Sequence, residues 1–214
     1  MGLLIDKTLK DFNSLLAGSE PAPGGGSTAA LSGLLGTALS MMVVNLSTGK
    51  KAYEALDEDI KKQIGEDFRI IRSLNTELLE LIDEDTRAFN SLMEAMKLNK
   101  ETGEEKAVRA EAIQKAGRHT LEVPLKVAEK CVQALKSQGI IAQYGNKNAV
   151  SDVGVGVLLA YAGLEGAALN VRINLPGIDD TSVRTKAEEK VESFLEEGRK
   201  LKTHIMSIVN NRIR

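Results

Sequence analysis

The stretch that decides the fold is residues 53–96, which read YEALDEDIKKQIGEDFRIIRSLNTELLELIDEDTRAFNSLMEAM. Its apolar residues recur at steps of three and four, which is the spacing of one face of an α-helix. Because the span exceeds 40 residues, it predicts either one long helix or a helix broken near Gly65. The positions of this apolar stripe are Tyr53, Leu56, Ile60, Ile64, Phe68, Ile71, Leu74, Leu78, Leu81, Phe89, Leu92 and Met96.

One position of the stripe carries an ionisable side chain. Between Leu81 and Phe89 the stripe position is Asp85. A carboxyl group on a buried face loses hydration, which disfavours its charged form and raises its pKa. A raised carboxyl pKa is what a general acid–base catalyst near neutral pH requires. The alternative is that the stripe drifts here and Asp85 reaches solvent beside Arg87.

The segment before this stripe predicts a helix of unusual composition. Residues 27–46 are rich in glycine, alanine and serine and follow a loop at residues 21–26. Ser27 or Thr28 can cap the helix. Because small side chains let neighbouring helices approach closely, we expect this second helix to be buried or to lie in a subunit interface.

The remaining chain is helical in pattern as well. One helix is expected from residue 104, with a kink or restart at Pro124 and an end at Gly139. Another is expected over residues 149–170, and a last one after a cap at residues 179–181. The sequence therefore predicts an all-α fold: a single domain over residues 1–214, a bundle of about six to eight helices with a long third helix and a buried second helix.

Composition excludes several classes of function. Twenty-eight basic against 30 acidic residues give a net charge of −2, and aromatic residues make up only 3%. Neither value is typical of a surface that binds nucleic acid. A single cysteine excludes an internal disulfide framework and a cysteine-rich zinc site. The two histidines, His119 and His204, fall in no helical metal-ligand motif, so no metal site is predicted.

Membrane insertion is the broad alternative to a water-soluble bundle. Residues 21–49 carry no charge and are long enough to cross a bilayer. However, this stretch is full of glycine, serine and threonine and has no aromatic belt. We therefore expect a buried helix, no membrane partner and a cytoplasmic protein, since no signal-peptide pattern begins the chain.

Two groups of polar residues are candidates for binding. The loop with Gly24, Gly25, Gly26 and Ser27 can bring backbone N–H groups together at a helix start, which favours an anion. The alternative is a tight turn fitted beneath neighbouring helices. The pairs Asn148/Asp152 and Asn170/Asn174 each have a spacing of four, so each pair shares a helical face. They could line a polar pocket, or serve in capping and helix–helix hydrogen bonds.

Five motifs in order resemble one known family. Residues 22–27 (APGGGS) with the small-residue helix resemble the opening of the formiminotetrahydrofolate cyclodeaminase family, and residues 85–89 (DTRAF) resemble its Asp-x-x-Ala-Phe segment. Residues 123–125 (VPL), 145–152 (GNKNAVSD) and 170–175 (NVRINL) follow in the order of the family. The resemblance covers nearly the whole chain.

The resemblance implies an all-helical, dimeric folate enzyme whose active-site carboxylate is Asp85. It would convert 5-formiminotetrahydrofolate to 5,10-methenyltetrahydrofolate with release of ammonia, with the folate as substrate and no further cofactor. Four polar residues are then expected to bind substrate: Asn148, Asp152, Asn170 and Asn174. The amides suit the neutral pterin. The Gly24–Ser27 turn is expected to bind the anionic glutamate tail. The formimino group would come from a separate formiminotransferase.

Two alternatives stay open. Stand-alone relatives of the family act as methenyltetrahydrofolate cyclohydrolases, in which water takes the place of ammonia. A protein of another class, a non-catalytic helical interaction protein, would use its small-residue helix to dock a partner.

Overall fold

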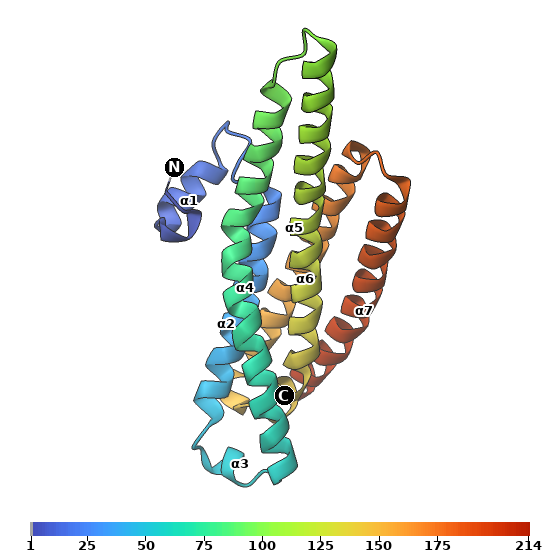
Figure 1. Ribbon diagram of the computed structural model, residues 1–214. Coiled ribbons are helices and arrows are strands. Elements are labelled where there is room, and N and C mark those ends of the chain that lie inside the picture. The colour runs from blue at the N-terminus through green and yellow to red at the C-terminus, as the bar shows by residue number, and fades with distance from the viewer. Residues whose placement is uncertain (1) are drawn as a thin grey trace.

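The computed structural model describes residues 2–214, and in these residues the apolar stripe folds as two helices (Figure 1). A short helix, α3 (Lys51–Glu54), precedes the long helix α4 (Glu58–Lys97). The prediction of one long helix is confirmed, and α4 runs through Gly65 without a break. Gly65 faces solvent with no neighbour within 4 Å, so its low helix propensity is offset by the buried face of α4.

Helix α2 (Gly25–Ser47) is the small-residue helix, and it packs most extensively on α6 and then on α4. The expected cap at Ser27 or Thr28 is wrong, because the N-cap is Gly24. The helix begins earlier, so the Thr28 hydroxyl donates to the Gly24 carbonyl (2.8 Å) and the Ser27 hydroxyl is free to turn elsewhere. Its glycines bring α6 close: a Cβ at Gly36 would lie 2.6 Å from the Gly156 carbonyl oxygen.

Helix α5 (Gly103–Tyr144) contains Pro124 and Gly139 and is continuous, so the predicted restart and the predicted end are both wrong. Proline has no N–H to donate four residues back, which leaves the Thr120 carbonyl without its helical partner. The Asn174 side chain donates to that carbonyl instead (2.7 Å). A contact from another helix therefore replaces the bond that proline removes.

The C-terminal third forms α6 (Val150–Asn174) and α7 (Thr181–Ile213), with 3₁₀ turns at Lys147–Ala149 and Leu175–Gly177. The predicted cap is confirmed at Asp180, which accepts from the backbone N–H groups of Ser182 and Val183. Together α2, α4, α5, α6 and α7 form the all-α bundle that the sequence predicts. Figure 1 shows α4 and α5 extending beyond the other helices as a hairpin.

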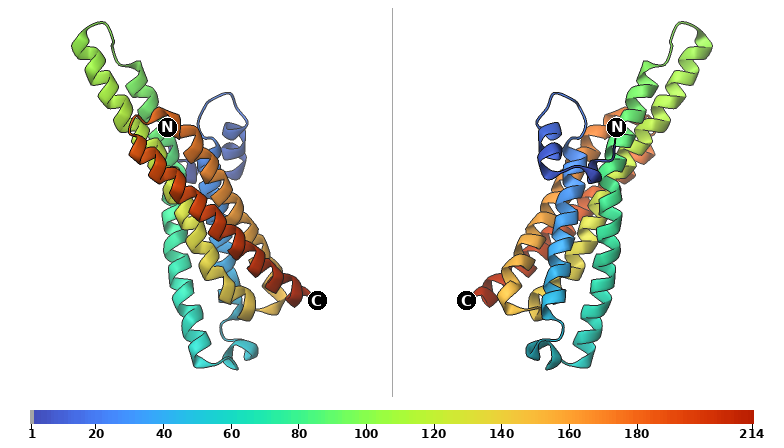
Figure 2. Two further views of the ribbon diagram at one scale, coloured as in Figure 1. Left: turned by 90° about the vertical axis from the view of Figure 1, so that its right-hand side faces the viewer. Right: turned by 90° about the vertical axis from the view of Figure 1, so that its left-hand side faces the viewer.

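A short N-terminal arm lies outside the bundle, beside the start of α2 (Figures 1 and 2). It consists of a 3₁₀ turn (Leu4–Asp6) and α1 (Leu9–Leu16). The backbone N–H of Leu4 donates to the buried carboxylate of Asp83 on α4 (2.6 Å). This contact fixes the arm near the beginning of α2.

Two segments, Gly25–Ser47 and Lys147–Gly177, are long and apolar enough to cross a membrane by length and composition. In the bundle the inner faces of α2 and α6 are buried against each other and against α5. Their outer faces carry exposed apolar side chains.

Candidate functional site

Asp85 lies on α4 against the first turn of α2. The Ser27 hydroxyl donates to its Oδ2 (2.9 Å) and lies 3.3 Å from the Thr86 hydroxyl. The carboxyl group is so close to α2 that a Cβ at Gly26 would lie 2.0 Å from Asp85 Oδ1. Only glycine leaves room for the carboxyl at this distance, so the glycine-rich start of α2 and the polar position of the stripe form one structural unit.

The electrostatic environment of Asp85 is dominated by loss of water. Burial raises the pKa of the Asp85 carboxyl, and hydrogen bonds from the Ser27 side chain and backbone offset part of that effect. Arg87 does not neutralise it, because Arg87 pairs with Glu84 (2.6 Å). Asp85 is half-buried, so the stripe does not drift far enough to expose it fully beside Arg87. A partly buried carboxyl with a raised pKa can exchange protons closer to neutral pH than an ordinary aspartate can.

Asn170 and Asn174 lie at the same end of the bundle as Asp85. A Cβ at Gly25 would be 3.3 Å from Asn170 Nδ2, which places the amide directly beside the glycine turn. That amide donates to the Gly166 carbonyl (2.8 Å), so its oxygen is left to accept from a ligand. Asn174 is one turn further along α6, and its amide is occupied by the Thr120 carbonyl.

Asn148 and Asp152 lie at the other end of α6. Asp152 precedes Asn170 by 18 residues, so the two are about 27 Å apart along the helix. The expectation that both polar pairs line one pocket is therefore not met within a single subunit. Asn148 instead borders a pocket of about 350 Å³, lined by Ser47, Lys50, Ala52, Tyr53, Leu56, Gln143, Tyr144, Gly145, Asn146, Lys147, Asn148 and Arg212.

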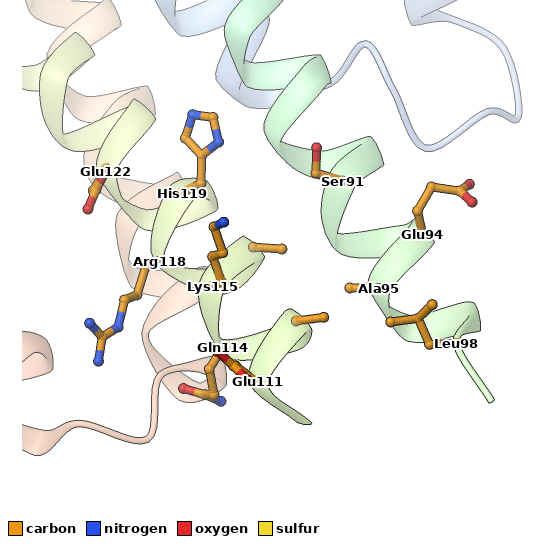
Figure 3. Close-up of a pocket in the computed structure, with 12 residues that line it drawn as sticks. Ser91, Glu94, Ala95, Leu98, Glu111, Gln114, Lys115, Arg118, His119 and Glu122 are labelled. Atoms are coloured by element: carbon orange, nitrogen blue, oxygen red, sulfur yellow. The ribbon is translucent and has the colours of Figure 1, made fainter. Parts of the chain in front are cut away.

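A larger groove of about 1100 Å³ runs between the projecting parts of α4 and α5 (Figure 3). Figure 3 shows Ser91, Glu94 and Leu98 on α4 opposite Lys115 and His119 on α5. Asp85 does not line this groove. At its inner end the His119 Nε2 lies 2.9 Å from Glu84 Oε1, one residue before Asp85. The lining of the groove mixes acidic and basic side chains, so it favours neither an anionic nor a cationic ligand. We therefore place the candidate site at Asp85 and describe the groove as a neighbouring feature.

Sequence reasoning missed two parts of this region. The Glu84–His119 pair joins residues 35 positions apart, and no local pattern predicts it. The second missed part is the hydrogen bond from Asn174 to the Thr120 carbonyl. The sequence does contain a signal for it, because Pro124, four residues after Thr120, removes the helical partner of that carbonyl. Among residues 2–214, no three His, Cys, Asp or Glu side chains come together as a metal site would require.

The candidate site is thus a partly buried carboxyl held against the glycine-rich start of a helix in an all-α bundle. Residues 8–193 match the family model described as formiminotransferase-cyclodeaminase. The chain therefore belongs to the formiminotransferase-cyclodeaminase family, and the resemblance drawn from its motifs is confirmed.

Individual relatives divide between two reactions. The chain is 39% identical over 208 residues to a methenyltetrahydrofolate cyclohydrolase of Methylorubrum extorquens, covering 97% of this chain and 98% of that one. It is 36% identical to the formimidoyltransferase-cyclodeaminase of Gallus gallus, of which it spans 38%. The crystal structure of formiminotetrahydrofolate cyclodeaminase from Thermotoga maritima matches with a TM-score of 0.84 at 25% identity over 98% of both chains. The family is thus one of folate one-carbon cyclodeaminases and cyclohydrolases.

Proposed function

We propose that this chain cyclises 5-formiminotetrahydrofolate to 5,10-methenyltetrahydrofolate with release of ammonia, and that Asp85 is its general acid–base catalyst. The observation that carries the proposal is the Asp85 carboxyl, which is partly buried, has a raised pKa and is held by Ser27 against Gly26. The cyclodeaminase from Thermotoga maritima, matched over nearly its whole length, supports this reaction.

The chemistry needs two proton transfers and no covalent intermediate with the protein. The formimino group enters in its protonated form (C=NH₂⁺); N10 of the folate attacks its carbon and loses its own proton, which gives a neutral tetrahedral centre that carries an amino group. The C–N bond to the former imino nitrogen then breaks, and that nitrogen must be protonated to leave as ammonia. One carboxylate that takes the proton from N10 and returns one to the departing nitrogen performs both transfers. Ser27 fixes the carboxyl by holding Oδ2, which leaves Oδ1 to exchange the proton.

The residues that would bind the substrate lie at the same end of the bundle as Asp85. The oxygen of Asn170 faces the region beside Gly25, where it can accept from an N–H of the pterin. Gly24, Gly25 and Gly26 at the start of α2 present backbone N–H groups that suit a carboxylate of the glutamate tail. Holding the two folate nitrogens close to the one-carbon unit would supply much of the remaining rate.

Methenyltetrahydrofolate cyclohydrolase is the second candidate. The relative from Methylorubrum extorquens, similar over the full length of both chains, favours it. In that reaction Asp85 would take a proton from water as it adds to the methenyl carbon. The C–N bond to one folate nitrogen would then break, with a proton returned to that nitrogen as the new hydroxyl loses its own, which leaves a formyl group on the other nitrogen. The near-ultraviolet absorbance of the methenyl product or substrate distinguishes the two reactions, because the purified chain can be given each folate separately. Turnover of methenyltetrahydrofolate alone would make the cyclohydrolase the correct assignment.

Asp85→Asn tests the mechanism, because it preserves shape and removes proton exchange. We expect a loss of turnover of about 10²–10⁴-fold. Glu80→Gln is the matched control, since it neutralises an exposed carboxylate on the same helix. Asp85→Asn turnover at the parent rate would show that this carboxyl is not the catalyst.

The remaining features of the proposal concern the location of the enzyme, its oligomeric state, the source of its substrate and its cofactors. The enzyme acts in the cytoplasm as a homodimer, takes its formimino substrate from a separate formiminotransferase, and uses no metal or added cofactor. Turnover that survives extended chelation with EDTA supports the metal-free mechanism, and activity restored only by a divalent ion contradicts it.

A further inference from the structure

Two hydroxyl groups beside Asp85 depart from the pattern of most serines and threonines in these helices. A hydroxyl within a helix commonly donates to a backbone carbonyl three or four residues earlier. The residues that do so here are Thr28, Thr37, Ser40, Ser47, Thr76, Ser91, Thr120 and Thr203. In residues 2–214 neither Ser27 nor Thr86 makes this bond, and their hydroxyl oxygens instead lie 3.3 Å apart between α2 and α4.

The direction of these hydrogen bonds follows from the number of hydrogens. The Ser27 hydroxyl has one hydrogen, which it donates to Asp85 Oδ2 at 2.9 Å. The contact between Ser27 and Thr86 must therefore be a bond that Thr86 donates. The single hydrogen of Thr86 is then committed to Ser27, so the Thr86 oxygen can only accept further bonds. While Asp85 is ionised, the chain of three side chains presents an acceptor at both ends.

The Thr86 oxygen lacks a donor from the protein. Ser27 is fully buried, whereas Asp85 and Thr86 are each half-buried and reach the same side of the start of α2. Within the described residues 2–214 no N–H or O–H group donates to Thr86, whose hydroxyl contacts Ser27 alone. A half-buried acceptor without a protein donor is satisfied by water or by a ligand. A ligand that contacts the Asp85 carboxyl can therefore also donate to Thr86.

The charges around Asp85 favour a cationic group at this place. Among residues 2–214 the Asp85 carboxylate forms no ion pair, because Arg87 on α4 and His119 on α5 both bind Glu84 instead. Residues 25–47, which form α2, carry no charged side chain. A cationic N–H donor would meet a carboxylate without a counter-charge and an acceptor hydroxyl together. Hydrogen bonds from a charged donor are about twice as strong as those between neutral groups.

We propose that Thr86 determines specificity: its oxygen accepts from the nitrogen that leaves as ammonia, and this contact favours release of ammonia over hydrolysis. The inference rests on the proposed function. There the amino group of the tetrahedral centre takes the proton that Asp85 received from N10 and becomes –NH₃⁺. Its C–N bond then breaks with both electrons passing to the leaving nitrogen, while the lone pair of a folate nitrogen forms the C=N bond of the methenyl product.

The two reactions make different demands on an acceptor. An –NH₃⁺ group has three donors and no lone pair, so acceptors alone can bind it, and Asp85 and Thr86 supply two of them. In hydrolysis the proton of the attacking water passes to Asp85, and the oxygen that remains is a neutral hydroxyl. Loss of a hydrogen bond to a charged group costs more than loss of one to a neutral group. Removal of the Thr86 oxygen should therefore slow ammonia release more than hydrolysis.

Thr86→Val tests this difference, because valine keeps the shape of threonine and lacks the oxygen. We expect kcat for 5-formiminotetrahydrofolate to fall about 10–100-fold, and kcat for hydrolysis of methenyltetrahydrofolate by only about threefold. Both are measured on the pH-independent plateau of each variant, since loss of the bond to Ser27 also alters the pKa of Asp85. Thr86→Ser restores the oxygen and should recover most of the lost turnover.

A competition within one reaction removes any effect of folding. Methenyltetrahydrofolate is incubated with ammonium chloride, so that ammonia and water compete for the same methenyl carbon, and the formimino and formyl products are separated by chromatography. A variant that is only partly folded forms less of both products in the parent ratio. We expect Thr86→Val to shift the ratio towards the formyl product about tenfold.

Thr76→Val is the matched control, because Thr76 is an exposed threonine of α4 whose hydroxyl donates to the Arg72 carbonyl of the same helix (3.3 Å). It should keep the parent rates. Thr86→Ala repeats the test if the valine variant does not fold. An unchanged product ratio in Thr86→Val, or equal losses of both activities with helical circular dichroism retained, would overturn the assignment of Thr86. A parent chain that does not turn over 5-formiminotetrahydrofolate would instead contradict the proposed function.

Discussion

Two glycines of α2 serve different purposes. Gly26 leaves space for a side chain, because a Cβ there would meet the Asp85 carboxyl at 2.0 Å. Gly36 leaves space for a backbone, because a Cβ there would meet the Gly156 carbonyl oxygen at 2.6 Å and the Ala160 nitrogen at 2.9 Å. The first contact shapes a candidate site and the second holds two helices together.

This difference predicts that function and stability can be separated within one helix. At the start of α2, the neighbour is the end of a side chain that can turn away at modest cost in folding. In the middle, the neighbour is the backbone of α6, which cannot move without displacing the whole helix. Substitutions at the first position should therefore act on turnover, and those at the second on the free energy of unfolding.

Gly26→Ala is expected to give the larger effect on activity. The new methyl group forces the Asp85 carboxyl to rotate away and lose its bond to Ser27, and such a displacement costs turnover about 10²-fold. Gly139→Ala on α5 is the control, since its Cβ would meet only Ile205 Cγ1, at 4.0 Å, and Gly139 has no part in the candidate site. Steady-state kinetics of both variants measure the difference, and equal activity of the two would contradict the assigned role of Gly26.

Gly36→Ala should destabilise the fold by about 1–3 kcal/mol, because an overpacked helix contact must open. Gly65→Ala is the control on α4, where the site is open and alanine should stabilise the helix by up to about 1 kcal/mol. Urea denaturation followed by circular dichroism gives both values. A Gly36→Ala protein as stable as its parent would mean that α2 and α6 pack less closely than described.

Local patterns were enough to predict much of this structure. The three- and four-residue spacing of the stripe predicted α4, and the polar residue in that stripe directed attention to Asp85. The cap at Asp180 also followed from local chemistry. These features are predictable because they depend on residues that are neighbours in sequence or share one face of a helix.

The sequence-based predictions that were wrong concern features that depend on contacts between segments distant in the sequence. Pro124 was expected to interrupt α5. Instead, the side-chain amide of Asn174 on α6 donates to the Thr120 carbonyl, which replaces the hydrogen bond that the missing proline N–H would have made. Asn148 and Asn170 shared a composition that suggested one pocket, yet they lie at opposite ends of α6. The length and direction of α6 decide that placement, and no pattern of neighbouring residues contains it.

Asp85→Asn is also expected to change stability, in the direction opposite to activity. The folded-state pKa of Asp85 is raised by burial above the ordinary value of 3.8, so the folded chain binds a proton more tightly than the unfolded chain. The parent therefore loses stability as pH rises from about 3.8 through the raised pKa. The variant has no such loss and should be more stable than the parent at neutral pH, by less than the Gly36→Ala effect. Thermal unfolding across this range measures the gap, which should close in acid.

Ser27→Ala should give the smallest change and the most specific one. The Ser27 hydroxyl donates to Asp85 and so holds its pKa below the value that burial alone would produce. Removing the donor raises the pKa of Asp85 further, because the charged form loses a hydrogen bond and the neutral form loses less. The acidic limb of kcat against pH should therefore move to higher pH, whereas Thr28→Ser, which keeps its hydroxyl on the Gly24 carbonyl, should leave it in place. A limb that stays fixed in Ser27→Ala would show that another group controls it.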